Sequence, residues 1–336
     1  MDSLENSSGD ERATGRLAPS PTGALHLGNA RTFMVAWLSA RSRGGKVILR
    51  MEDLDHPKVK PFAAEQALDD LRWLGFDWDE GPDVGGPSAP YVQSQRRAIY
   101  RRHLEKLVAA GKAYPCVCTR AEVERCQSAP HEGETLRYDG RCRDRFASYD
   151  EAIAAANGRA PAWRFRLPDG PDATVVSLDD AFAGHFEQDV ATHSGDFPLA
   201  RDADGAGYAL AVVADDAAMG VTEVVRGDDL LPATPAQTLV QRALGLPTPR
   251  YCHVPLVVGP DGRRLAKRHG DTRIATFRAE GVPPEKIIGI LAASCGWCEA
   301  RQMASLGDLV GSFTLATIPR SPVVFSSLDA FSLHTR

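Results

Sequence analysis

A loop rich in proline and glycine near the N-terminus carries residues that could bind phosphate. It reads Pro19-Ser20-Pro21-Thr22-Gly23-Ala24-Leu25-His26-Leu27-Gly28-Asn29, and helical spacing of apolar residues begins directly after it. A helix N-terminus offers free N–H donors and the positive end of the helix dipole, which together suit phosphate. Gly28 would let the backbone approach a ligand closely, and His26 could donate to a phosphoryl oxygen. By itself, a histidine two residues before a glycine is more typical of a surface turn. The preceding eight residues make the pattern more specific for a phosphate-binding loop.

A second candidate is a basic run late in the chain, Arg264-Leu265-Ala266-Lys267-Arg268-His269-Gly270. It follows a predicted strand, Val254–Val258, and a turn, Gly259–Gly262. The Lys267 ammonium could neutralise negative charge on a phosphate group. The run alone is more typical of a solvated basic turn.

Acidic residues follow a predicted buried strand, Lys46–Met51. Three carboxylates, those of Glu52, Asp53 and Asp55, stand within four residues of one another. Ligands of an open α/β sheet bind beyond the carboxyl ends of its strands, so these groups could bind an amino group or Mg²⁺. A solvated acidic strand end is the alternative.

Two arginines lie where a charged side chain needs a partner. Arg226 ends a predicted buried strand that begins at Glu223, and Arg16 stands in the first predicted strand. A buried arginine requires a carboxylate or phosphate, or else it leaves an unpaired charge. The partner is either a ligand or a structural carboxylate, for which Asp53, Asp228 and Asp229 are the candidates.

The middle of the chain contains closely spaced cysteines. Cys116 and Cys118 are followed by Cys126, His131 and Cys142. Thiolates at such spacing in a reduced protein indicate zinc, and imidazole or thiolate is the commonest choice of fourth ligand. From the residues alone, His131 or Cys126 is therefore expected to complete the set. Another pair, Cys295 and Cys298, lies at the end of an apolar helix, and we interpret it as core.

The elements that must position these residues alternate between strand and helix. Helices are predicted from Asn29 to Arg43, from Ala63 to Leu74 and from Pro235 to Leu244, and the run Tyr208–Val213 is predicted as a buried strand. This alternation is typical of a doubly wound parallel sheet, an α/β fold, here split by an insertion. The expected divisions are a disordered tail (1–13), the first half of the catalytic domain (14–105), an insertion with the zinc site (106–198), the second half (199–262), and a basic loop with a short helical C-terminal part (263–336).

Composition limits the classes of function. The 336 residues are 43% apolar and carry a net charge of −5, from 39 basic and 44 acidic residues. An acidic chain that binds nucleic acid must use local basic patches. The candidate patches are Arg96, Arg97, Arg101 and Arg102 on one helix and Arg263, Arg264, Lys267 and Arg268 in the loop. The polar N-terminus lacks the apolar segment of a secretory signal, no apolar run is long enough for a membrane span, and seven cysteines suggest reduced thiols, so a cytoplasmic location is expected.

The strings quoted above resemble a known family. The segment RLAPSPTGALHLGNARTFMVAWLSARSRGGKVILRMEDLDHP is similar to the opening of the class I glutamyl-tRNA synthetases, with His26-Leu27-Gly28-Asn29 as the HIGH-type signature. The basic run is similar to the KLSKRHG loop of that family, although Arg264 and Ala266 depart from it. The resemblance covers roughly residues 14–300.

The resemblance implies roles for individual residues. Catalysis would involve His26 and Lys267, and Thr22, Gly23, His26, Gly28, Asn29 and Lys267 would bind ATP with Mg²⁺. Glutamate would bind to Arg16, Leu17, Ala18, Pro19, Ser20, Glu52, Tyr208 and Arg226. A structural zinc ion would be held by Cys116, Cys118, Tyr138 and Cys142, because the spacing resembles the short glutamyl-Q synthetases, in which a tyrosine completes the set.

About 66 residues follow the basic loop, too few for the anticodon-binding domain of a full glutamyl-tRNA synthetase. The chain therefore resembles the family of short paralogues that activate glutamate with ATP and attach it to queuosine in tRNA(Asp). No membrane association and no obligate protein partner are expected. The alternatives are a truncated synthetase that charges tRNA(Glu) and a non-catalytic paralogue that binds glutamate or tRNA.

Overall fold

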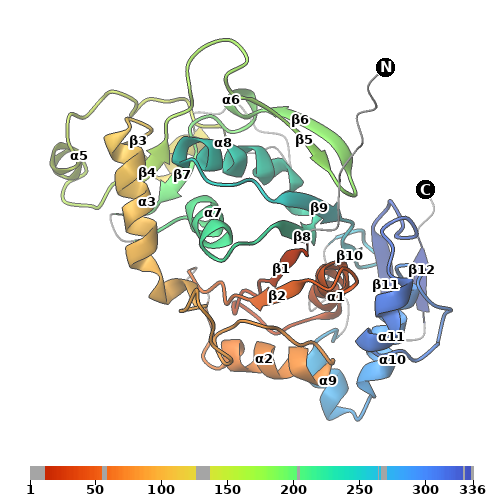
Figure 1. The fold of residues 1–336 in the computed structure, drawn as a ribbon. Coiled ribbons are helices and arrows are strands. Elements are labelled where there is room, and N and C mark those ends of the chain that lie inside the picture. The colour runs from red at the N-terminus through yellow and green to blue at the C-terminus, as the bar shows by residue number, and fades with distance from the viewer. Residues whose placement is uncertain are drawn as a thin grey trace.

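The computed structural model describes residues 12–54, 59–125, 137–202, 205–263, 265, 271–327 and 330–333. Its centre is a parallel sheet (Figure 1). In it, β1 (Thr14–Leu17) pairs with β2 (Lys46–Leu49), and β8 (Glu223–Gly227) pairs with β9 (Arg250–Val254). The Thr222 N–H donates to the Thr14 carbonyl at 3.0 Å, so β8 lies beside β1 and the order is β2-β1-β8-β9. The carboxyl ends of β1, β2 and β8 thus share one edge.

Helix α1 (Leu27–Arg41) packs against β1 and β8 and begins at the proline- and glycine-rich loop. The His26 side chain caps it, since Nδ1 accepts hydrogen bonds from the Gly28 N–H at 3.1 Å and the Asn29 N–H at 3.4 Å. The Asn29 side chain accepts from the His26 N–H in return. A Cβ atom on residue 28 would lie 3.1 Å from the imidazole, so glycine makes room for the capping ring.

The remaining elements extend the α/β alternation. The other helices are α2 (Ala63–Trp73), α3 (Arg97–Ala109), α4 (Arg120–Arg125), α5 (Tyr149–Ala155), α6 (Val190–His193), α7 (Tyr208–Ala218), α8 (Thr234–Leu244), α9 (Ile274–Ala279), α10 (Pro284–Ala293) and α11 (Leu306–Leu309), with 3₁₀ turns at Gln93–Gln95, Asp228–Ala233 and Val310–Ser312. The predicted first strand and the helices from Asn29, Ala63 and Pro235 are confirmed to within a few residues at each end. Among the described residues, no helix is both long and apolar enough to cross a membrane.

The prediction of a buried strand at Tyr208–Val213 is wrong. This run is the start of α7, which packs against α3 and α8. The seven residues Leu210–Asp216 are all buried, so the helix has no polar face to produce a helical pattern. A short, continuously apolar run fits a buried strand and a buried helix equally well.

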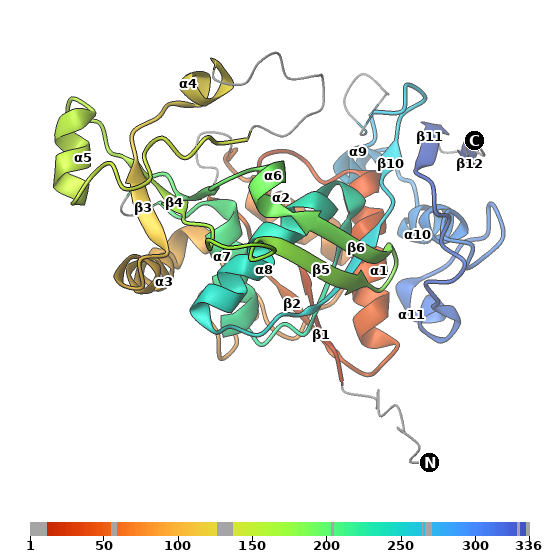
Figure 2. The same ribbon diagram turned by 90° about the horizontal axis from the view of Figure 1, so that it is seen from above.

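The chain forms a second sheet after β2 and before β8, so this sheet separates the two halves of the central sheet in sequence. It has the antiparallel order β3 (Ala113–Cys116), β4 (Ala162–Phe165) and β7 (Pro198–Ala200). A hairpin of β5 (Val175–Asp180) and β6 (Gly184–Asp189) follows β4. Figure 2 shows β3, β4, α4 and α5 extending to one side of the central sheet.

The C-terminal part differs from the helical prediction. It does contain α9, α10 and α11, but it ends in β11 (Val323–Ser327) and β12 (Ala330–Leu333). β11 pairs in parallel with β10 (Val257–Val258), which is separated from β9 by Pro255 and Leu256 rather than continuous with it. The short apolar segment Val323–Phe325 is buried, so packing against β10 decides its conformation.

The main hydrophobic core lies between α1, the central sheet and the C-terminal helices. It includes Leu17, Met34, Leu49, Val254 and Leu291, all almost completely buried. Cys295 belongs to this core and Cys298 packs against it, which confirms the interpretation of that pair. A second core joins β4 and β7 to α7 and α8. Each core abuts the sheet that carries one of the two polar sites described below.

Candidate active site

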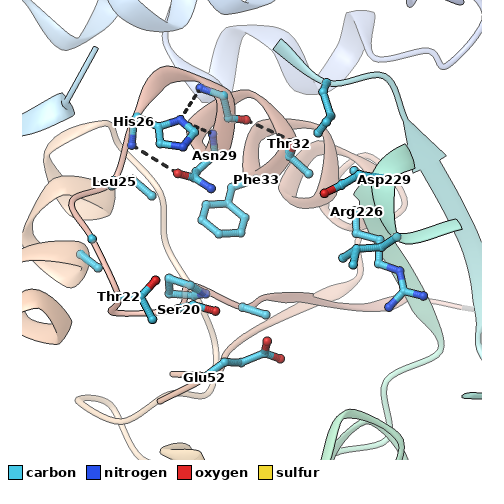
Figure 3. Close-up of a pocket in the computed structure, with 18 of the residues that line it drawn as sticks. Ser20, Thr22, Leu25, His26, Asn29, Thr32, Phe33, Glu52, Arg226 and Asp229 are labelled. Atoms are coloured by element: carbon cyan, nitrogen blue, oxygen red, sulfur yellow. Dashed lines mark hydrogen bonds between the residues drawn. The ribbon is translucent and has the colours of Figure 1, made fainter. Parts of the chain in front are cut away.

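A cavity of about 560 Å³ opens at the carboxyl edge of the central sheet (Figure 3). Most of the predicted ATP- and glutamate-binding residues line it: Arg16, Ala18, Pro19, Ser20, Thr22, Gly23, His26, Gly28, Asn29, Glu52, Tyr208 and Arg226. They come from β1 and the loop after it, the start of α1, the segment after β2, the start of α7 and the end of β8. Segments more than 200 residues apart in sequence therefore build one site.

One end of the cavity is the start of α1, where Figure 3 shows His26 and Asn29 beside each other. Because His26 Nδ1 accepts from two backbone N–H groups, the proton of the neutral imidazole resides on Nε2. The ring can thus donate from Nε2, next to a helix N-terminus that attracts anions. This arrangement suits the phosphates of a nucleotide.

Glu52 lies toward the other end of the cavity and is held by a fully buried arginine. Nη2 of Arg50 donates to Glu52 Oε1 at 2.9 Å, and Nη1 of Arg50 donates to Asp216 Oδ1 at 2.6 Å. Burial raises the pKa of Glu52, while the charges of Arg50 and Arg16 act in the opposite direction. A carboxylate so oriented can accept hydrogen bonds from a substrate ammonium group.

Arg226 is 4% exposed, and the partners that the structure gives it are neutral. Its Nε donates to His253 Nε2 at 2.9 Å, and its Nη2 donates to Thr234 Oγ1 and Gln237 Oε1, both at 2.8 Å. Its Nη1 lies 3.5 Å from the hydroxyl of Tyr208. In the described part of the chain no carboxylate lies within ion-pair distance of Arg226. A buried guanidinium with neutral partners at the rim of a cavity suits an anionic ligand.

Arg16 is the second buried arginine of the cavity. Its Nη1 donates to the Val225 carbonyl at 2.8 Å, and Asp216 Oδ1 is 3.9 Å from its Nε. That Nε finds no hydrogen-bond acceptor among the described residues. Of the structural carboxylates considered from the sequence, Asp53 instead accepts from the Ser94 backbone and hydroxyl. Asp216, which the sequence did not single out, is the ion-pair partner of Arg16.

Two of the predicted residues are not among the described residues that line the cavity. Leu17 is completely buried in the main core and is not among the residues that line the cavity. Lys267, like Arg264, Ala266 and Arg268, lies outside the described residues. The cavity also has lining residues to which the sequence assigned no binding role: Ala24, Leu25, Thr32, Phe33, Ala67, Val225, Gly227, Asp229, Leu230, Leu256, Val257 and Leu265. Most are apolar, and only their positions beside the loop and strand ends could have indicated them.

The predicted zinc ligands also come together. The Sγ atoms of Cys116, Cys118 and Cys142 all lie within 4.8 Å of one another, and those of Cys118 and Cys142 are 3.5 Å apart. The Tyr138 hydroxyl is 3.4 Å from Cys116 Sγ and 3.8 Å from Cys118 Sγ. The competing candidates, His131 and Cys126, lie outside the described residues.

These spacings fit a tetrahedral metal ion. Zinc–sulfur bonds of ~2.3 Å place the sulfurs of a tetrahedral site about 3.8 Å apart. Hydrogen bonds from Cys116, Tyr138 and the Val117 backbone lower the pKa of Cys142 to about 4, so the cluster favours a thiolate. The Arg164 guanidinium lies over the Tyr138 ring at 3.7 Å, and its Nε donates to Cys116 Sγ at 3.2 Å. A metal ion held by all four side chains would have no open coordination position, as in structural zinc sites.

One basic patch predicted for RNA contact requires correction. Arg96 is 2% exposed, and its Nε donates to Asp215 Oδ1 at 2.6 Å, so it anchors the start of α3 and is not accessible to RNA. Arg97, Arg101 and Arg102 are exposed on α3, as expected for a patch.

Comparison with known proteins adds family relationships to this geometry. The family model described as tRNA synthetases class I (E and Q), catalytic domain, matches residues 13–327. A protein of Symbiobacterium thermophilum named glutamyl-Q tRNA(Asp) synthetase is 50% identical over 312 residues, which are 92% of this chain and 94% of that protein.

Longer relatives match over the same part of the chain. Glutamate–tRNA ligase of Heliobacterium modesticaldum is 42% identical over 313 residues, and the match spans 62% of its length. The crystal structure of a glutamate tRNA ligase from Elizabethkingia meningosepticum, in complex with its amino acid, superposes with a TM-score of 0.79 at 29% identity. That match covers 94% of this chain and 67% of the ligase.

Proposed function

The chain belongs to the class I tRNA synthetases (E and Q), and on that premise we propose that it activates L-glutamate with ATP and transfers it to queuosine in the anticodon of tRNA(Asp). Relatives named glutamyl-Q tRNA(Asp) synthetase, matched along nearly their whole length, support this choice of acceptor. The observation that carries the activation step is the charge pattern of the cavity. Two buried arginines and Glu52 complement the two carboxylates and one ammonium of glutamate.

In the first step an oxygen of the glutamate α-carboxylate attacks the α-phosphorus of ATP. The bond to the bridging oxygen breaks, and the products are glutamyl-adenylate and pyrophosphate. Arg16, Arg226 and Glu52 hold the amino acid, with Tyr208 beside Arg226. His26 donates from Nε2 to a phosphoryl oxygen, and we assign Lys267 to the departing pyrophosphate, where charge develops.

In the second step a hydroxyl of the queuosine cyclopentene ring attacks the adenylate carbonyl. The hydroxyl loses its proton, an ester forms, and AMP leaves. Reaction requires that hydroxyl to lie within reach of the adenylate, which the protein achieves by binding the anticodon loop over the cavity. The exposed arginines of α3 are candidate phosphate contacts on that path.

We further infer that Cys116, Cys118, Tyr138 and Cys142 hold one zinc ion. Its contribution would be structural, because it would tie the segment after β3 to the loop that carries Tyr138 and Cys142. None of the residues assigned to the chemistry belongs to this cluster.

Glutamate-dependent exchange of labelled pyrophosphate into ATP tests the activation step. We expect exchange with glutamate and Mg²⁺ in the absence of tRNA, because the cavity is formed by the described chain alone. Glutamine and aspartate serve as controls that should not support it. Failure of exchange at high enzyme concentration would overturn the proposed activation and favour a protein that only binds glutamate or tRNA.

A further inference from the structure

Behind Arg226 lies a buried aspartate–histidine pair that none of the roles above uses. His253, on β9, is completely buried, and Asp180, at the end of β5, is 5% exposed. Asp180 Oδ2 is 2.6 Å from His253 Nδ1, and His253 Nε2 is the atom to which Arg226 Nε donates at 2.9 Å. The three side chains therefore form a chain of hydrogen bonds that ends at the rim of the cavity.

The direction of this chain follows from the chemistry of its members. A guanidinium can only donate, so His253 Nε2 must be the acceptor and must carry no proton. A neutral imidazole then holds its single proton on Nδ1, from which it donates to Asp180. Burial lowers the pKa of His253, which keeps the ring neutral. Only one tautomer of His253 is thus compatible with the observed position of Arg226.

Asp180 is itself rigidly held. Its Oδ1 accepts hydrogen bonds from three backbone N–H groups, those of Phe182, Ala183 and His253, at 2.8 to 3.0 Å. Burial raises the pKa of Asp180, but the hydrogen bonds from His253 and the backbone outweigh it and hold the pKa below its usual range. The carboxylate therefore stays ionised, with Oδ2 directed at the histidine.

We propose that Asp180 and His253 are positioning residues for Arg226: Asp180 fixes the tautomer of His253, and the Nε2 lone pair of His253 directs the guanidinium toward a carboxylate of the amino-acid substrate. This inference rests on the proposed function for the identity of that substrate. Orientation by a fixed acceptor matters here because the other acceptors, Thr234 and Gln237, both contact Nη2. The contact with His253 at Nε fixes the plane of the group and leaves Nη1 facing Tyr208 and the cavity.

Asp180→Asn tests the tautomer directly. The amide oxygen can keep the three backbone hydrogen bonds, but its NH₂ then faces His253 Nδ1 and moves the ring proton to Nε2, opposite the Arg226 N–H. A buried Asp-to-Asn change of this kind preserves geometry while it selects the wrong tautomer. We expect the KM for glutamate to rise about tenfold or more, the factor for losing a hydrogen bond to a charged group. The KM for ATP should remain close to the wild-type value.

The chain offers a matched control one residue earlier. Asp179 pairs with His185 at 3.0 Å on the exposed side of the same hairpin. Asp179→Asn makes the same substitution on the same strand and should leave both KM values unchanged. Nitrogen-15 NMR of the imidazoles provides the second readout: in Asp180→Asn the protonated and unprotonated ring nitrogens of His253 should exchange places.

A double-mutant cycle with His253→Gln separates positioning from general damage. The glutamine carbonyl can accept from Arg226 but has no tautomer to switch, so adding Asp180→Asn in that background should have little further effect on the KM for glutamate. If Asp180→Asn does not fold, His253→Gln and His253→Leu decide the question, since only the leucine variant removes the acceptor and should raise this KM.

A switched tautomer with an unchanged KM for glutamate, or equal effects of glutamine and leucine at position 253, would overturn the proposal. Its failure is distinguishable from failure of the proposed function. If wild-type protein activates no glutamate, the Arg226 Nε–H resonance still reports the contact with His253. That resonance should shift in Asp180→Asn, and an unshifted resonance would overturn the positioning role whatever the substrate.

Discussion

The two polar sites of this chain satisfy their charged groups in opposite ways. In the cysteine cluster, the three sulfurs lie within 4.8 Å of one another, and the Tyr138 hydroxyl lies 3.4 Å from Cys116 Sγ and 3.8 Å from Cys118 Sγ. In the cavity, Arg226 has neutral partners and the Nε of Arg16 finds no acceptor among the described residues. A closed set of ligands suits a structural role, whereas a cavity with incompletely paired charges suits a ligand that comes and goes. Changes in the cavity should therefore affect chemistry, and changes in the cluster should affect stability.

The largest effect should come from Arg226→Ala. Losing one member of a buried charge pair costs about 2–5 kcal/mol, so the KM for glutamate should rise roughly 30- to 4,000-fold. Steady-state pyrophosphate exchange measures it. Arg250→Ala is the matched control, because Arg250 lies on the adjacent strand β9, is half exposed and pairs with Glu223. Similar KM values for the two variants would contradict the binding role of Arg226.

Lys267→Ala should lower the rate of activation by about 10²- to 10³-fold, the range for removing one group that stabilises transition-state charge. The KM for glutamate should change little, since the ammonium acts on phosphate and not on the amino acid. Single-turnover formation of adenylate separates the two constants. Wild-type kinetics in this variant would show that the basic run is not the catalytic loop.

Glu52→Gln should weaken glutamate binding by roughly 10- to 150-fold, because a hydrogen bond to a charged group contributes about 1.5–3 kcal/mol. The pH profile sharpens this prediction. Burial raises the pKa of Glu52, so kcat/KM of the wild type should fall as the pH drops toward that pKa and the carboxylate becomes protonated. In the variant this acid limb should be absent. An identical limb in both proteins would assign it to another group.

The smallest effect on activation should come from Cys142→Ser. We expect this variant to lose its zinc in metal analysis, to unfold at a lower temperature and to retain glutamate-dependent exchange. Cys298→Ser, which changes a thiol next to the main core, should keep the metal. Zinc retained in Cys142→Ser but lost in His131→Ala would replace the tyrosine with the histidine as a ligand.

The sequence predicted the residues that line the cavity better than the buried residues that hold them in place. Arg16, Glu52 and Arg226 stand out because a charge at the end of an apolar strand requires a partner. Arg50 carries the same signal, but the sequence does not show its partner, and Asp216 and His253 give no such signal. Their partners lie at distant points of the chain: the Arg50–Asp216 contact joins residues 166 positions apart. The roles of these three residues exist only once β2, β9 and α7 are packed together.

Contacts between distant parts of the chain also explain the residues and elements that the sequence assigned wrongly. The apolar run from Tyr208 fits either a strand or a helix. Its packing as α7 between α3 and α8 decides that it is a helix. Arg96 stands in a basic segment that is typical of an exposed patch, yet its side chain is buried and forms an ion pair with Asp215 on α7. The cluster of Cys116, Cys118 and Cys142 was predictable because these cysteines are close in sequence and few functions other than metal binding use that pattern.

The most direct test of the account measures where the glutamate goes. Labelled glutamate, ATP and the protein are incubated with tRNA from cells that make queuosine and from cells that do not. We predict label on tRNA(Asp) from the first source alone, abolished by periodate oxidation of the queuosine diol, because unmodified guanosine lacks the reacting hydroxyl. Equal labelling of both pools, or label on the 3′-terminal adenosine of tRNA(Glu), would contradict the account and identify a synthetase that charges tRNA(Glu).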